Sequence, residues 1–275
     1  MVWLYRSMTS RSNCSRGGAH EPSAYPGRQR PPYPWTYSRQ RPLMTLQALF
    51  VTGTDTGVGK TRVAAALCRA FAARGARVAA MKPVASGCTP TPEGLRNEDA
   101  LALLDAMNVR ADYSIVNPYA FAPAIAPHIA AREAGVNIDF GVLDRAYERL
   151  RMQSEVLIVE GAGGWLAPLD AARGFADLAV HWQMDVVLVV GMRLGCLNHA
   201  LLTAESIERR GLRLRGWVAN SIDPLFERLQ ENISTLQSRI LAPCLGFFSF
   251  EPQANPLTLA QALAVNALAA AAELS

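Results

Sequence analysis

The chain has 275 residues, a mass of 29.8 kDa and 50% hydrophobic residues, which suits one large α/β domain with a sizeable core. Five scattered cysteines, an odd number, argue against a disulfide framework or a zinc site and favour a reducing, cytoplasmic location. No stretch reaches the roughly 18 apolar residues of a membrane helix, so membrane insertion is not expected. The net charge of +4 arises in a basic N-terminal segment, and the rest of the chain is mildly acidic, so we do not expect that part to bind nucleic acid.

That basic segment, residues 1–43, holds seven arginines and one acid and is rich in Pro, Ser and Tyr, with no apolar periodicity. Three interpretations compete: a transit peptide, a disordered arm, or translated sequence upstream of a true start at Met44. We favour the last, because Met44 lies two residues before the first predicted strand. The predicted organisation is a disordered or non-native extension over 1–43 and a single P-loop α/β domain over 44–275.

From Leu46 onward, apolar strands alternate with amphipathic helices. Strands that are apolar throughout indicate a sheet covered on both faces, and regular alternation indicates parallel strands. The sequence therefore predicts an α/β fold of the P-loop NTPase type, with a doubly wound, mostly parallel sheet and helices on both faces. The predicted strands are 46–52, 77–81, 155–159, 185–190, 214–219 and 243–247, and the predicted helices are 60–74, 98–107, 141–153, 175–183, 198–210, 224–239 and 257–274.

A glycine-rich segment, Gly53-Thr-Asp-Thr-Gly-Val-Gly-Lys-Thr61, lies between the first strand and the first helix. A strand, a glycine turn and a helix in this order present backbone N–H groups to phosphate, which disfavours a chance glycine turn. Lys60 is expected to reach the β- and γ-phosphates, and the Thr61 hydroxyl to bind Mg²⁺. Five residues separate Gly53 from Gly59, one more than the general motif has.

Polar side chains follow the next two central strands at their carboxyl ends, where ligands bind in such sheets. Lys82 and Ser86 come after the second strand, although a lysine at a strand end can simply be solvated. Glu160 ends the third strand and runs into a glycine turn at 161–164, as expected of an acid that faces bound Mg²⁺. Asp99, in the first turn of a helix, could simply complement the helix dipole.

The later segments are less informative. A helix beginning near Asn198 offers free N–H groups to an anion such as a substrate carboxylate. Asn220 ends a strand and could read a purine edge, although an asparagine turn with no ligand is nearly as good an explanation. Residues 111–134 are predicted to form a long shaped loop, in which His128 is more naturally structural than catalytic.

Two residues narrow the class of phosphate-loop protein. Asp55 stands where partition and nitrogenase-iron-type ATPases carry a second lysine. The segment Asn220-Ser-Ile-Asp223 lacks the lysine that translational-type GTPases use to read the base. Both kinds of switch protein are therefore disfavoured.

Seven blocks, in order along the chain, resemble the dethiobiotin synthetase family. The resemblance extends from Phe50 to about Leu245, and the extra residue in the phosphate loop is normal for that family. One segment departs from the family pattern: Phe248–Pro252 replaces the usual Pro-x-Leu, which puts the nucleotide-base preference in doubt. The seven blocks are residues 53–61, 82–87, 94–99, 117–119, 159–165, 194–200 and 216–220.

The resemblance implies an ATP- and Mg²⁺-dependent ligase that closes a ureido ring on 7,8-diaminopelargonic acid with CO₂. A carbamate forms, ATP phosphorylates it, and the second amine closes the ring, giving dethiobiotin, ADP and phosphate for biotin biosynthesis. The family also implies a homodimer with the substrate site near the subunit interface. Two alternatives remain: an amide synthase of the cobyrinic-acid type, for which Cys244 lacks partners as a nucleophile, and a nucleotide-dependent regulatory protein.

The resemblance also assigns roles to residues. Catalysis is assigned to Lys82, Lys60 and Thr56, and substrate binding to Ser86, Gly195, Cys196, Leu197 and Asn198. Mg²⁺ binding is assigned to Thr61, Asp99 and Glu160. ATP binding is assigned to Gly57, Val58, Gly59, Lys60, Thr61, Arg62, Asp99, Glu160, Gly161, Ala162, Gly163, Asn220 and Ser221.

Overall fold

The computed structural model describes residues 47–251 and 255–270, and the extension predicted for residues 1–43 lies outside them. A six-stranded sheet has the order β10-β9-β8-β1-β7-β2, with every neighbouring pair parallel. The predicted doubly wound sheet and its six strands are confirmed. The strands are β1 (Gln47–Gly53), β2 (Val78–Met81), β7 (Val156–Glu160), β8 (Asp185–Met192), β9 (Leu214–Ser221) and β10 (Cys244–Phe248).

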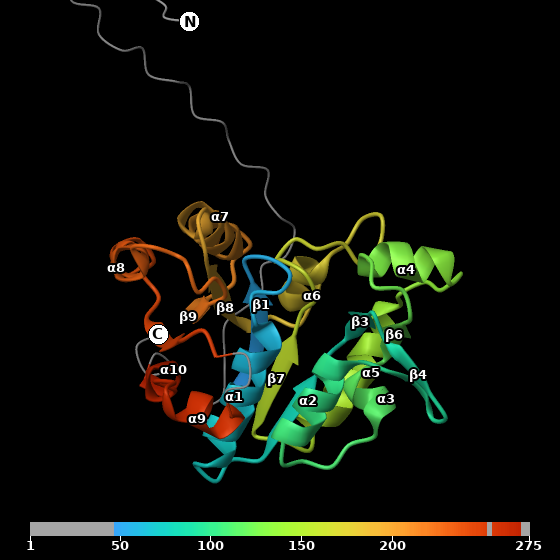
Figure 1. Ribbon diagram of the computed structural model, residues 1–275. Helices are drawn as coiled ribbons and strands as arrows, with labels where there is room; N and C mark the ends of the chain where they lie inside the picture. Colours follow the sequence, from blue (N-terminus) through green and yellow to red (C-terminus); the bar gives the residue numbers. More distant parts are fainter. Residues whose placement is uncertain (1–46, 252–254, 271–275) are drawn as a thin grey trace, which may run out of the picture. The chain divides into compact units, whose positions relative to one another are not determined.

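Helices cover both faces of this sheet (Figure 1). The helices α1 (Lys60–Ala72), α2 (Glu98–Ala106), α9 (Pro256–Gln261) and α10 (Asn266–Ala270) contribute to the core on one face. On the other face the core is built with α5 (Phe140–Arg151), α6 (Phe175–His181), α7 (Cys196–Arg209) and α8 (Leu229–Arg239).

The strands supply both cores because their side chains alternate between the two faces. In β1, Phe50 packs into the core with α5 and α6, whereas Leu49 and Val51 pack into the core with α1. All five residues of β7 are buried. Burial on both faces explains why these strands read as uninterrupted apolar runs.

Because the strands are parallel, their carboxyl ends meet at one edge of the sheet. The register pairs Val51 with Glu160, Gly53 with Val189, and Gly191 with Asn220. The loops that follow β1, β7, β8 and β9 therefore lie near one another, at the upper edge of the molecule in Figure 1. We refer to this edge as the carboxyl edge.

The region beside β2 contains short elements that the sequence analysis missed. The segment 111–134, predicted to be a loop, is partly regular. It holds α3 (Tyr113–Val116), β6 (Tyr119–Phe121) and α4 (Pro127–Glu133). Strand β3 (Val84–Ser86) pairs with β6, and β4 (Thr89–Thr91) pairs with β5 (Gly94–Arg96). Strands of three residues are too short to show a periodic pattern in the sequence.

Three predicted helix boundaries were wrong. The helix predicted from Pro224 begins at Leu229, because the Asp223 carboxylate accepts from Leu225 N and forms a turn instead. The helix predicted over 257–274 divides into α9 and α10 where Ala264 N donates to Leu245 O of β10. Residues 271–274 lie outside the described part. The helix predicted from Asn198 begins at Cys196, with Gly195 as its N-cap.

Candidate active site at the carboxyl edge

The phosphate loop, residues 53–61, joins β1 to α1 and needs glycine at specific positions. Gly57 and Gly59 have φ of 73° and 88°, in the left-handed region that favours glycine. A Cβ at Gly59 would lie 2.2 Å from Asn220 Nδ2, and one at Gly53 would lie 2.5 Å from Val58 Cγ2. The loop is therefore held close to neighbouring side chains at both ends.

Neighbouring strands fix the loop from the side. Thr54 N donates to Val189 O of β8 at 3.0 Å. Asn220 Nδ2, at the end of β9, donates to Val58 O at 2.8 Å. Asn220 Oδ1 is buried and has no hydrogen-bond partner among the described residues. An amide oxygen buried in this way is able to accept a hydrogen bond from a ligand.

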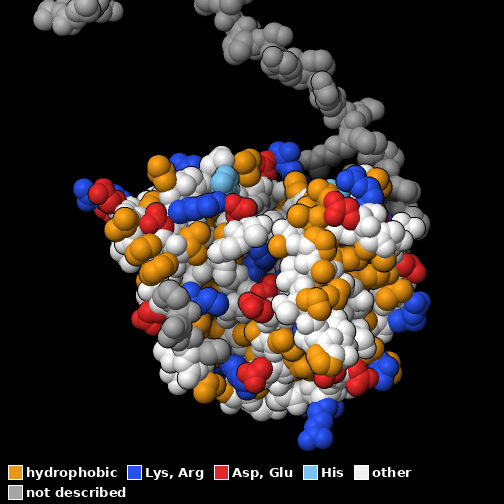
Figure 2. Space-filling view, turned by 45° about the vertical axis from the view of Figure 1, so that its right-hand side comes forward, with side chains coloured by type: hydrophobic (Ala, Val, Ile, Leu, Met, Phe, Trp, Pro, Cys, Tyr) orange, Lys and Arg blue, Asp and Glu red, His pale blue; other side chains and the backbone are white. Residues whose placement is uncertain are grey.

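Four side chains form a compact polar cluster beside the start of α1, and we call Thr61, Lys82, Asp99 and Glu160 the Lys82 cluster. Lys82 Nζ lies 2.6 Å from Glu160 Oε1 and 2.8 Å from Asp99 Oδ2. Thr61 Oγ1 lies 2.7 Å from Asp99 Oδ1 and 2.9 Å from Glu160 Oε1. Figure 2 shows a hollow in the surface with basic and acidic side chains inside it and at its margin.

The charges in the Lys82 cluster shift one another's pKa values. Burial favours the neutral forms of Lys82 and Glu160. For Lys82 the attraction of Glu160 and Asp99 outweighs burial, so the pKa of its ammonium is raised and the group stays charged at neutral pH. The pKa of Glu160 is raised, chiefly by burial. The pKa of Asp99 is lowered because attraction and hydrogen bonding from Lys82 outweigh its burial.

Lys60 lies in the phosphate loop itself and is buried. Its Nζ donates to Asp55 O at 2.9 Å. Burial and, secondarily, the positive charge of Lys82 lower the pKa of Lys60 to about 8. Lys60 and Lys82 are the only lysines among the chain's 27 basic residues.

The structure also contains an ion pair that the sequence analysis missed. The Arg193 guanidinium, one residue beyond β8, contacts Asp55 Oδ2 in the phosphate loop. Asp55 Oδ1 accepts a hydrogen bond from Thr56 N at 2.7 Å. The sequence held one signal for this pair: Asp55 is an acid in a loop expected to bind anions. A negative charge there is unfavourable unless a positive side chain lies beside it.

Of the other predicted site residues, Gly161 contacts the Lys82 cluster directly, because its carbonyl accepts from Lys82 Nζ at 3.3 Å. Ser86 ends β3, and its carbonyl accepts from Asn97 Nδ2 at 3.4 Å, next to Asp99. Residues 195–198 form the start of α7. Arg62 donates to the carbonyl of Glu251 at 2.8 Å, in the segment that departs from the family pattern.

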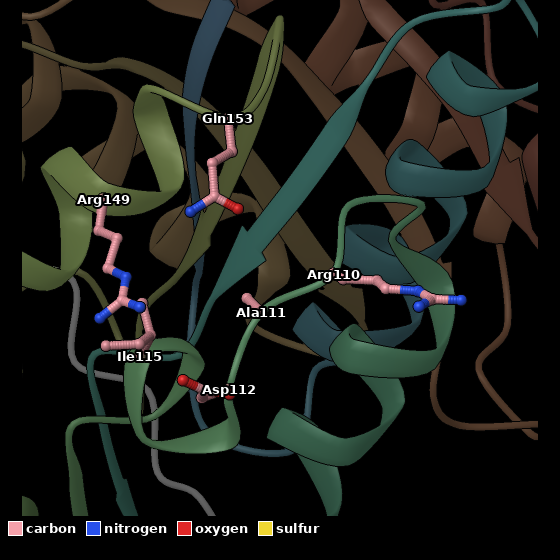
Figure 3. A pocket seen from close by; sticks show the side chains of 6 residues that line it. All are labelled: Arg110, Ala111, Asp112, Ile115, Arg149 and Gln153. Atoms are coloured by element: carbon pink, nitrogen blue, oxygen red, sulfur yellow. The ribbon is translucent and has the colours of Figure 1, made fainter.

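A cavity of about 240 Å³ lies elsewhere (Figure 3). Its lining comes from the segment after α2, from α3 and from the end of α5, and includes Arg110, Arg149 and Gln153. The neighbouring residues Asn108 and Val109 donate from their backbone N–H groups to Val78 O at the beginning of β2. This cavity is thus at the opposite end of the sheet from the phosphate loop.

Comparison with known proteins decides the family. The model of an AAA domain family matches residues 47–258. The ATP-dependent dethiobiotin synthetase of Pseudomonas aeruginosa (strain UCBPP-PA14) is 54% identical over 216 residues, covering 78% of this chain and 95% of that protein. The chain belongs to the dethiobiotin synthetase family. The dethiobiotin synthetase of Xanthomonas campestris pv. campestris (strain ATCC 33913) is 51% identical over 218 residues, covering 79% and 97%.

Membership confirms the family predicted from the seven sequence blocks and the assignment as a dethiobiotin synthetase, a ligase. Among solved structures, the MinD cell division protein of Aquifex aeolicus has a TM-score of 0.52 at 17% identity, covering 83% of this chain and 98% of that chain. The same protein in a MinC:MinD complex also has a TM-score of 0.52, at 18% identity, covering 83% and 97%. These likenesses concern the fold alone, and they confirm the predicted fold class.

Two further observations concern the described residues alone. Cys68, Cys88, Cys196 and Cys244 are free thiols, and Cys14 lies outside the described residues. Within residues 47–251 and 255–270 no helix combines the length and the apolar character needed to cross a bilayer.

Proposed function

We propose that this chain joins 7,8-diaminopelargonic acid and CO₂ into the ureido ring of dethiobiotin, with conversion of ATP to ADP and phosphate. The observation that carries the proposal is Lys82, a charged ammonium buried between Glu160 and Asp99 beside the phosphate loop. Both lysines of the chain lie at this edge, and arginine supplies every other basic side chain.

The reaction divides into three steps. One amine of the substrate adds to CO₂ and loses a proton, giving a carbamate. A carbamate oxygen then attacks the γ-phosphorus of ATP, and ADP leaves. The second amine attacks the carbonyl carbon of the resulting mixed anhydride, which expels phosphate, loses a proton and closes the ring.

The chain's own residues would act mainly by holding anions together, because the carbamate, ATP and phosphate are all negatively charged. Lys60 and the N–H groups of residues 57–62 would hold the phosphates. Lys82 would stabilise the carbamate and the transferred phosphoryl group, for which its charge suits it. Thr56 and Ser86 would position the reacting end of the substrate. Residues 161–163 would approach the phosphates with their backbone.

The Lys82 cluster also offers a fitting set of ligands for Mg²⁺. Thr61, Asp99 and Glu160 present hydroxyl and carboxylate oxygens, which a hard cation prefers. Glu160 Oε2 is buried and accepts no hydrogen bond from the described residues, so it is available as a ligand. The described residues hold no group of three His, Cys, Asp or Glu side chains arranged for a metal, and Thr61 would supply a hydroxyl ligand beside the two carboxylates. When bound, Mg²⁺ would offset the negative charge of the phosphate oxygens.

The adenine of ATP and the distal carboxylate of the diamine would bind at two separate places. Asn220 Oδ1 is free to accept from the exocyclic amine of adenine, with Ser221 beside it. Gly195, Cys196, Leu197 and Asn198 would receive the distal carboxylate of a substrate bound mainly to a second copy of the chain, in a cytoplasmic homodimer. An amide-synthase chemistry is disfavoured, because burial raises the pKa of the Cys244 thiol and so suppresses the nucleophilic thiolate.

The test is a turnover assay with the diamine, bicarbonate, Mg²⁺ and ATP, in which ADP release and dethiobiotin mass are both measured. We expect ADP and dethiobiotin in equal amounts, and neither without the diamine. ADP release no greater than in the diamine-free control would overturn the proposal and favour a nucleotide-dependent binding protein.

A further inference from the structure

The ion pair between Arg193 and Asp55 joins two segments that the proposed function uses separately. Asp55 lies in the phosphate loop, and Arg193 follows β8, 138 residues later. The two side chains are 45% and 43% exposed, so water screens their attraction and the pair adds little to the stability of the fold. Its position suggests a role other than stability.

On the phosphate-loop side, Asp55 contacts Lys60, which would hold the phosphates, and Thr56, which would position the substrate. Its carbonyl accepts from Lys60 Nζ at 2.9 Å, and its carboxylate accepts from Thr56 N at 2.7 Å. A carboxylate in a loop that binds phosphate is unfavourable unless a cation offsets it. Arg193 supplies that cation: it contacts Asp55 Oδ2, while Oδ1 of the same carboxylate accepts from Thr56 N.

On the other side, Arg193 belongs to the turn that begins α7. Its carbonyl accepts from Cys196 N at 3.0 Å, and Gly195 follows with φ of 94°. Leu194 between them is 91% exposed. Because Arg193 is part of this turn, a ligand that changes the turn also moves the guanidinium that holds Asp55.

We propose that Arg193 is a positioning residue that couples the start of α7 to the phosphate loop through Asp55, so that the diamine substrate and the nucleotide bind cooperatively. The inference rests on the proposed function, because that function places on this turn the distal carboxylate of a substrate bound mainly to the second copy of the chain. The coupling thus links that substrate to the nucleotide of the chain that carries the turn. By linkage, each ligand raises the affinity of the other by the same factor.

The experiment measures the dissociation constant of Mg·ADP by calorimetry, with and without 7,8-diaminopelargonic acid. We expect the diamine to tighten ADP binding by the wild-type protein about fivefold, the lower end of typical coupling between sites. In Arg193→Gln we expect ADP alone to bind about tenfold more weakly than to the wild type, because the unpaired Asp55 carboxylate then repels the phosphates. We also expect the diamine to leave the ADP affinity of this variant unchanged.

Three further variants make the result specific. Arg193→Lys keeps the charge and should retain most of the coupling. Asp55→Asn combined with Arg193→Gln should bind ADP more tightly than Arg193→Gln alone, since no unpaired charge remains. Arg210→Gln is the matched control: Arg210 pairs with Asp177 at 2.7 Å, with 35% and 38% exposure, beyond the far end of α7. It should leave both the affinity and the coupling unchanged.

The outcomes separate this inference from the proposed function. Retained coupling in Arg193→Gln, equal loss in Arg210→Gln, or no coupling in the wild type would each overturn the inference. Wild-type turnover with the diamine would still support the proposed function in all three cases. Conversely, the wild type could show no turnover while ADP binding is weakened in Arg193→Gln and not in Arg210→Gln. That result would overturn the proposed function and keep the role of Arg193 in the phosphate loop. Melting temperatures close to that of the wild type show that the variants are folded.

Discussion

Lys82 Nζ lies 2.6 Å from Glu160 Oε1, and the two side chains are only 3% and 1% exposed. A buried pair of this kind is held together by attraction and hydrogen bonding, because a charge left unpaired in the interior would have nothing to offset its desolvation. Removing one partner costs about 3–5 kcal/mol, and less where the remaining carboxyl can take up a proton. The pair therefore ties the end of β7 to the residue that follows β2, next to the phosphate loop.

Replacing Lys82 separates catalysis from nucleotide binding. In Lys82→Ala we expect turnover to fall by about 10²–10⁴-fold, because a cation that stabilises developing charge is lost. The dissociation constant of ATP should stay within a few fold, since Lys60 and the backbone of the loop remain. Steady-state ADP release and calorimetric ATP binding check the two parts. Lost ATP binding in a folded variant would show that Lys82 holds the nucleotide.

Glu160 tests the proposed metal ligands. Glu160→Gln keeps the size of the side chain and removes its charge, so we expect the Mg²⁺ concentration needed for half-maximal turnover to rise by about 10–100-fold. Glu155→Gln, just before the opposite end of the same strand and largely exposed, is the control and should leave the Mg²⁺ dependence unchanged. An unaltered Mg²⁺ requirement in Glu160→Gln would contradict the assignment.

The two glycines of the phosphate loop should differ in their tolerance of alanine. Both have positive φ, so each substitution costs about 1–2 kcal/mol of backbone strain. A Cβ at Gly57 meets nothing within 4 Å, whereas at Gly59 it would lie 2.2 Å from Asn220 Nδ2. We expect Gly59→Ala to abolish measurable ATP binding and Gly57→Ala to weaken it only modestly. Equal affinities in the two variants would show that the contact with Asn220 is unimportant.

The thiols provide a test at alkaline pH. Burial raises the pKa of Cys68 to about 12 from an ordinary value of 9.0, so the folded protein keeps a proton that the unfolded chain releases as the pH rises above 9. Stability contributed by this difference is complete below pH 9 and is lost between pH 9 and 12. We expect iodoacetamide at pH 9 to label Cys68 in denatured protein but not in native protein, as followed by mass spectrometry. Comparable labelling rates in the two states would contradict the burial.

Local features of the chain were predictable from the sequence for local reasons. The six central strands appear in the sequence as apolar runs because both faces of the sheet are covered. This pattern does not depend on the position of a strand in the sheet order. The phosphate loop is equally local, since Gly59, Lys60 and Thr61 follow one another in a single segment between β1 and α1. The short strands β3 and β6 escaped prediction because each depends on a partner more than 30 residues away.

Only the tertiary structure decided which charges meet. Lys82 and Asp99 are 17 residues apart, and Arg193 and Asp55 are 138 apart. Such pairs depend on the strand order and on the register that aligns the carboxyl ends, neither of which is encoded in a single segment. The sequence by itself determined that this chain has a phosphate loop on a parallel sheet. The packed sheet decided that Lys82 is buried between two carboxylates and that Asp55 has a counter-ion, because charges from separate segments become neighbours only when the strands are paired.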